Sequence, residues 1–212
     1  MPTVIDQKTT SSYLALLELA HREGLALSRT KLAKLLYFAD LEAVIDREER
    51  PTSIEWKWLE YGPFENALYL LEGDLREQGW VAHQTVQYPS YTGHEFSIQR
   101  FDYARPTDVI WANLACQVER YGRLAAVSVK DLAYQTPPML AAQRGGERGV
   151  VLDLELARPN QSKVTGAVAR LKAVRDALDA GEDAPGSQDA LVDDLSAFSD
   201  ARTAVNKYLL DV

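Results

Sequence analysis

The sequence contains a single cysteine, Cys116, and only three histidines in 212 residues. One cysteine cannot form an internal disulfide, which is typical of a reducing compartment, so we expect a cytoplasmic protein. His21, His83 and His94 are scattered, whereas metal sites usually bring several ligands together at short, repeated spacings. No pair of carboxylates or nucleophile with a base stands out for catalysis. These absences predict a protein that is not an enzyme and that binds no metal or cofactor.

Long apolar runs are missing as well. Leu14–Leu17 is the longest candidate near the start, and it lies inside an amphipathic segment, so we expect neither a signal peptide nor a membrane span. Positive charge is in deficit, with 23 Lys and Arg against 31 Asp and Glu and a formal net charge of −8. Because nucleic acids and anionic membranes attract basic surfaces, neither is expected as a partner.

The charge deficit is concentrated late in the chain. Residues 173–200 contain eight acidic residues and one base, Arg175, which gives this segment a net charge of −7. Such a run is most often a solvated face. The alternative is an acidic docking surface for a basic partner.

Aromatic residues are abundant in one stretch, Ile54–Leu75. Its beginning alternates between apolar and polar residues, as in a strand, and its second half repeats leucine at helical spacing. We expect Tyr61-Gly62-Pro63 to join the strand to the helix, with Pro63 in the first helical turn. Five aromatics are more than a small core needs, so some should be exposed as contacts for a partner protein. They are Trp56, Trp58, Tyr61, Phe64 and Tyr69.

The remaining periodicities predict a mainly α, α+β fold with a small antiparallel sheet. No periodicity is visible before Ser11. Helices are expected at 13–23, 29–46 with Ser28 as cap, 63–79, 107–122, after a capping box at Ser128–Asp131, after Thr136, and at 162–180 and 188–209. Strands are expected at 54–58, 80–88 and 94–100, an extended segment at 150–156, and a linker at 181–187. The order of elements over Tyr13–Arg100 is like that of a winged helix.

Two blocks of sequence carry a resemblance to a known family. Lys31–Ala39 reads KLAKLLYFA, and Trp58–Phe64, further along, reads WLEYGPF. In this order they resemble the Panacea domain family of SocA-like and GepA-like antitoxins, whose members have a K-L-x-K-L-L-Y-like helix followed by a Y-G-P segment. Leu132–Pro137 resembles the closing region of that family more loosely. The resemblance covers Ser12–Gln143, which suggests a Panacea-like domain at 1–150 and a C-terminal helical extension at 151–212.

The resemblance implies an antitoxin of a toxin–antitoxin system, which neutralises its cognate protein toxin by direct protein–protein binding. A second branch of the family acts as an adaptor that delivers the toxin to a protease, and that alternative stays open. Lys31 and Lys34 either lie on the solvent-exposed side of their helix or contact an acidic partner. The candidate partner-binding residues are therefore Lys31, Lys34, Trp56, Trp58, Tyr61, Phe64 and Tyr69.

The winged-helix-like order also raises the possibility of a DNA-binding regulator. In that case the helix expected over Phe64–Gln78 would enter the groove. It carries four acids (Glu65, Glu72, Asp74, Glu77) against Arg76, a net charge of −3. Because DNA phosphates would repel such a helix, charge argues against this alternative.

Overall fold

The computed structural model describes residues 6–87, 92–158 and 172. The chain divides into two units, residues 1–158 and 159–212, and all the described residues except Lys172 lie in the first. The helices expected at 162–180 and 188–209, the linker between them and most of the 89–93 loop lie outside the described residues. The helices described in the first unit are α1 (Gln7–Arg22), α2 (Arg29–Asp46), α3 (Ala67–Glu77), α4 (Asp108–Tyr121), α5 (Ala126–Tyr134), α6 (Pro137–Gly145) and the short 3-10 helix η1 (Leu154–Ala157).

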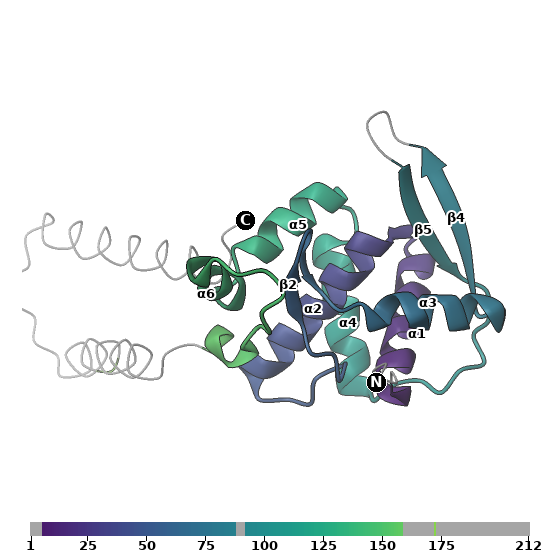
Figure 1. The fold of residues 1–212 in the computed structure, drawn as a ribbon. Helices are drawn as coiled ribbons and strands as arrows, with labels where there is room; N and C mark the ends of the chain where they lie inside the picture. The colour runs from purple at the N-terminus through teal and green to yellow at the C-terminus, as the bar shows by residue number, and fades with distance from the viewer. Residues whose placement is uncertain (1–5, 88–91, 159–171, 173–212) are drawn as a thin grey trace, which may run out of the picture. The chain divides into compact units, whose positions relative to one another are not determined.

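Two small antiparallel sheets accompany these helices (Figure 1). The strands are β1 (Leu27–Ser28), β2 (Lys57–Leu59), β3 (Gly62–Phe64), β4 (Val81–Gln87) and β5 (Thr92–Ile98). The first sheet has the order β1-β5-β4, and the second is the β2–β3 hairpin. Strand β1 pairs Leu27 with Phe96. The expected α+β class is confirmed, and so is the winged-helix-like order, here α1-β1-α2-α3-β4-β5 with the β2–β3 hairpin inserted before α3.

Helix α2 is the centre of this unit, as its nearly all-round apolar sequence predicts. Helices α1, α4 and α5 all pack against it (Figure 1). The hydroxyl of Ser28 accepts a hydrogen bond from the backbone N–H of Lys31 and caps the helix, as expected. The helix ends at Asp46, where Arg47 takes the left-handed conformation with φ 60°.

A buried carboxylate fixes the chain between α2 and β2. Asp40 is fully buried, and its oxygens accept from the Arg50 guanidinium (2.7 Å), the Thr52 backbone N–H (2.9 Å) and hydroxyl, and the Trp56 indole N–H (2.7 Å). Burial raises the pKa of Asp40, and the adjacent Arg50 opposes that rise. Because every one of these donors comes from residues 50–56, Asp40 determines the path of this segment and holds Trp56 in the core.

The expected joint between strand and helix at Tyr61-Gly62-Pro63 is wrong. Gly62–Phe64 is instead a strand, β3, which pairs with β2 in the register Leu59↔Gly62 and Trp58↔Pro63. Pro63 fits a strand here because it has no N–H to donate and the carbonyl oxygen of its partner Trp58 accepts instead from the backbone N–H of Gly149 at 2.7 Å. Helix α3 begins only at Ala67.

Other boundaries also differ from expectation, and the strand expected from Ile54 begins only at Lys57. Helix α1 begins at Gln7 rather than Tyr13, because the Asp6 carboxylate accepts from the Thr9 backbone N–H at 2.9 Å and caps it. Helix α5 begins at Ala126 with no side-chain cap, so the expected capping box at Ser128 does not form. Residues 151–158 belong to the first unit: Val151 bridges Lys57, and Leu152 and Leu154 are buried in the core.

Candidate functional site

The three segments that carry the family resemblance meet at one place. The Lys34 ammonium donates to the carbonyl oxygen of Pro63 at 2.7 Å, which ties α2 to the β2–β3 hairpin. The Tyr134 hydroxyl at the end of α5 donates to the carbonyl of Glu60 at 3.2 Å. The hydroxyls of Tyr37 and Thr136 lie 2.7 Å apart and join α2 to the start of α6. We call these five residues, Lys34, Pro63, Tyr134, Tyr37 and Thr136, the hairpin junction.

Lys34 is therefore a structural residue and not a surface contact, which corrects one of the predicted partner-binding positions. Its side chain is only 1% exposed. Burial, together with the charge of Lys130 nearby, lowers the pKa of Lys34 to about 7. The hydrogen bond to the carbonyl of Pro63 fixes the hairpin relative to α2. The apolar stripe of the helix did not predict that Lys34 is buried, because the hairpin it contacts is distant in sequence.

Gly62 is required by the same junction. Its φ of +91° lies in the left-handed region, where side chains are strained. A Cβ atom at this position would meet the Cε2 atom of Tyr134 at 3.1 Å. The glycine of the Tyr61-Gly62-Pro63 segment thus has a packing reason. Because Gly62 has no side chain, the ring of Tyr134 can lie against the hairpin backbone.

The remaining predicted contacts differ in exposure. Trp56 is 1% exposed and bound to Asp40, so its prediction as a partner contact is corrected too. Lys31 donates to the carbonyl of Gly122 at 2.8 Å, at the end of α4. Trp58 and Phe64 are partly buried against the core. The side chain of Tyr61, in the turn of the hairpin, is 63% exposed.

An apolar surface continues from the hairpin onto α3. Tyr69 and Leu70 are 50% and 54% exposed, and the rings of Phe64 and Tyr69 lie 5.0 Å apart. The guanidinium of Arg29 lies 4.8 Å from the Tyr69 ring and pairs with the buried carboxylate of Glu72 at 2.5 Å. We call Phe64, Tyr69 and Leu70 the α3 face. The Tyr69 ring of this face is held in place by Phe64 and Arg29, although it is half exposed to solvent.

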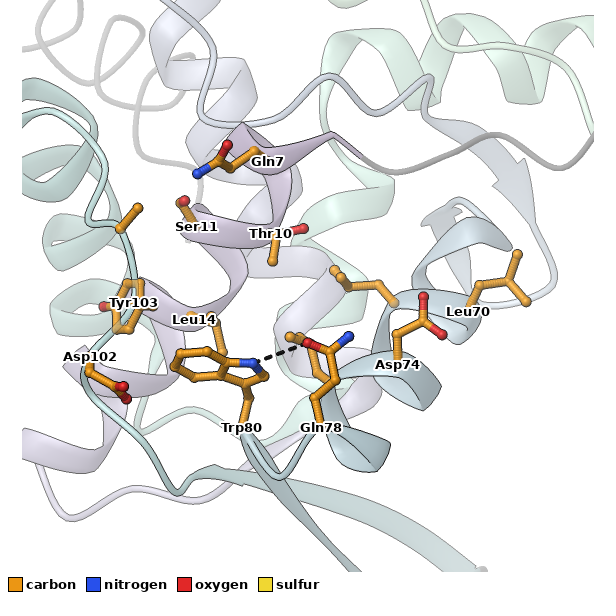
Figure 2. Close-up of a pocket in the computed structure, with 13 residues that line it drawn as sticks. Gln7, Thr10, Ser11, Leu14, Leu70, Asp74, Gln78, Trp80, Asp102 and Tyr103 are labelled. Carbon is orange, nitrogen blue, oxygen red and sulfur yellow. Dashed lines mark hydrogen bonds between the residues drawn. The ribbon is translucent and has the colours of Figure 1, made fainter.

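A pocket of about 530 Å³ lies beside this face, between α1, α3 and the segment that follows β5 (Figure 2). Its floor is buried and mostly leucine: Ser11, Leu14, Leu71 and Leu75. Leu70 and Asp74 of α3, with Gln78 just after the helix, form one rim. The Trp80 indole forms a wall and donates to the Gln78 side-chain oxygen at 3.2 Å (Figure 2).

The pocket is negatively charged. Asp74 and Asp102 line it, and none of its 13 lining residues is Lys, Arg or His. Asp102 is paired with Arg100 at 2.8 Å; this hydrogen bond lowers the pKa of Asp102, and the Arg100 guanidinium also lies 3.9 Å from the Trp80 ring. The carboxylate of Asp74, by contrast, has no ion pair among the described residues.

This pocket was not predicted from the sequence. No secondary structure was expected before Ser11, although Gln7 and Thr10 line one side of the pocket and Leu14 forms part of its floor. The available signal was Asp6 as an N-cap, followed by side chains at helical spacing. The position of Trp80 opposite α1 depends on the tertiary structure and carries no local signal.

Two of the histidines come together on the β4–β5 pair. His83 and His94, which looked unrelated in sequence, lie on adjacent strands with Nε2 and Nδ1 2.9 Å apart. Across residues 6–87, 92–158 and 172, no group of three or more His, Cys, Asp or Glu is placed to bind a metal ion.

The fold and the surface define an α+β protein with winged-helix-like order and an exposed aromatic and aliphatic face on α3 and the hairpin before it. No model of a known protein family matches the chain, and comparisons with curated proteins and solved structures find no similar protein. Within the described residues, no helix has the length and apolar character needed to cross a membrane.

Proposed function

We propose that this protein is the antitoxin of a toxin–antitoxin system in the cytoplasm and that it neutralises its toxin by direct contact. The observation that carries the proposal is the exposure of Tyr61, Tyr69 and Leu70 within ten residues of chain. Large aromatic side chains are the commonest energetic anchors of protein interfaces, and scattered surface apolar residues are not. The Panacea-like blocks support the same role, because they build the junction that presents Tyr61.

The rigidity of this surface also supports a binding role. Tyr61 lies in the turn of a hairpin that Lys34 and Tyr134 hold by hydrogen bonds, and Tyr69 packs between Phe64 and Arg29. A surface that is ordered before binding loses less conformational entropy in the complex. A neutralising interface of ordinary size buries about 1,600 Å² in total, far more than these side chains alone. They would form its centre.

The DNA-binding alternative is favoured by the winged-helix-like order and opposed by charge. In a winged helix, α3 would lie in the major groove and the β4–β5 hairpin beside it. The exposed charges of α3 are Asp74 and Glu77 against Arg76, and neither β4 nor β5 contains a Lys or Arg. Since phosphate contacts supply most of the affinity for DNA, this surface suits a protein partner better. A mobility shift of the chain's own promoter fragment at moderate salt would favour the regulator instead.

Co-expression with the product of the adjacent gene in a sensitive host tests the proposal. The wild-type chain should relieve growth arrest and elute with the toxin as one complex in size-exclusion chromatography. The double variant Tyr61→Ala and Tyr69→Ala should remain folded, because both side chains are exposed, and should lose both effects. Val127→Ala, on α5 and equally exposed, is the matched control and should behave as wild type. Unrelieved arrest by the wild type, without a complex, refutes the proposal.

The adaptor alternative makes a separate prediction. If the chain delivers its toxin to a protease, the half-life of the toxin falls when both chain and protease are present. An unchanged half-life, together with relieved growth arrest, leaves masking by direct contact as the mechanism.

A further inference from the structure

We propose that the pocket between α1, α3 and residues 99–104 binds a peptide segment of the partner that presents a large apolar side chain next to an arginine or lysine. This inference rests on the proposed function and adds the chemistry of the partner to it. Two features carry it, the apolar floor and the negative charge of the rim.

The floor provides the apolar half of the site. Leu14, Leu71 and Leu75 are buried below a space of about 530 Å³, within the range of about 300–1,000 Å³ typical of ligand pockets. The Trp80 indole adds a flat wall to this space. An apolar side chain that enters removes both its own surface and the floor from water, which favours binding.

The rim provides the charged half. Asp74 is exposed, lines the pocket and has no ion pair within the described residues. Asp102 contributes a second carboxylate, already balanced by Arg100. None of the lining residues is basic, and Arg100, which lies 3.9 Å from the Trp80 ring, is paired with Asp102. Asp74 is therefore the carboxylate left to attract a bound cation and to repel an acidic ligand.

The surroundings favour a peptide over a small molecule. The rim is contributed by α1, α3 and the segment after β5, and most of it is exposed, so the pocket is open to solvent. Leu70 belongs both to this rim and to the α3 face that begins at Phe64. A chain that fills the pocket can therefore continue across α3 toward Tyr69, whereas a small molecule would leave that surface uncovered.

The test is selection of random 12-residue peptides, displayed on phage, against the full chain. Enriched peptides should pair a large apolar residue with Arg or Lys. A synthetic copy of the most enriched peptide, titrated by calorimetry, should bind Asp74→Lys at least about tenfold more weakly and Asp74→Asn to an intermediate degree. Glu77→Lys is the matched control: the same charge change on the same exposed helix, outside the pocket lining, should alter the affinity by less than about twofold.

Several results would overturn the inference: no enriched peptide, enriched acidic peptides, or equal losses in Asp74→Lys and Glu77→Lys. Binding of tryptamine that depends on Asp74, without any enriched peptide, would identify a small-amine site and would also overturn it. The two proposals fail separately. If peptides behave as expected but no toxin is neutralised, the antitoxin role fails. If neutralisation survives Asp74→Lys and no peptide is enriched, only the pocket inference fails.

Discussion

Replacing Lys34 by methionine tests whether a lysine without a counter-charge is buried beneath the hairpin. Its pKa is lowered from 10.5 to about 7 because burial disfavours the charged form. Between these two values the unfolded chain holds the proton and the folded chain releases it. A group that binds fewer protons when folded makes the free energy of unfolding rise with pH. The wild type should therefore gain stability above about pH 7.

The size of this gain follows from the pKa difference. One unit of pKa corresponds to about 1.4 kcal/mol, and the slope reaches that value only above the folded-state pKa. From about pH 7 to about pH 9 the linkage of Lys34 contributes about 2 kcal/mol. Lys34→Met has no such linkage. It also leaves the carbonyl of Pro63 without its donor, which lowers stability by about 1–3 kcal/mol at every pH.

Urea denaturation of wild type and Lys34→Met at several pH values measures the difference. Subtracting the two curves cancels the titration of all other groups, so the stability of the wild type relative to the variant should rise by about 2 kcal/mol over that interval. Lys8→Met, which removes a surface lysine paired with Glu49, is the control and should leave a constant difference. A constant difference for Lys34→Met as well would refute the burial of an unpaired lysine.

Two further substitutions test the packing around the hairpin. Gly62→Ala should lower the free energy of unfolding by about 1–3 kcal/mol, because its φ is +91° and Tyr134 crowds the added Cβ. Gly73→Ala is the control: nothing lies within 4 Å of its added Cβ in α3, so it should raise the free energy of unfolding by about 0.5–1 kcal/mol. Asp40→Ala should lower it by about 3–5 kcal/mol, since Arg50 and other buried donors lose their acceptor; thermal melts that match the exposed control Asp46→Ala would contradict this role.

The sequence predicted α2 and the β4–β5 pair well because their signals are local. A serine cap, an apolar helix and two alternating segments depend on neighbours in the chain. Ser28 and β4 lie where expected, and β5 begins two residues earlier than expected, at Thr92. The β2–β3 hairpin was not predicted because helical spacing after Phe64 masked a strand of three residues. Its formation depends on Lys34, Val150 and Tyr134, which are distant in sequence.

Exposure of the aromatic cluster could be predicted only in part. Tyr61 and Tyr69 are exposed, but Trp56 is buried because the Asp40 carboxylate accepts its indole N–H. Composition shows that five aromatic residues are more than a small core needs. It does not identify which of them are buried by a hydrogen bond to a distant residue, as Trp56 is by Asp40. Predicting the pocket would have required the start of α1 and the position of Trp80. Neither follows from the periodicity of the sequence.

Hydrogen–deuterium exchange of the chain, alone and with the toxin bound, shows whether the hairpin and α3 are the surface that the toxin covers. Residues 61–78 should exchange more slowly on binding, because the hairpin turn and α3 would be covered. Unchanged exchange there, with protection confined to another surface such as α4 or α6, would contradict the claim that the hairpin and α3 form the docking surface.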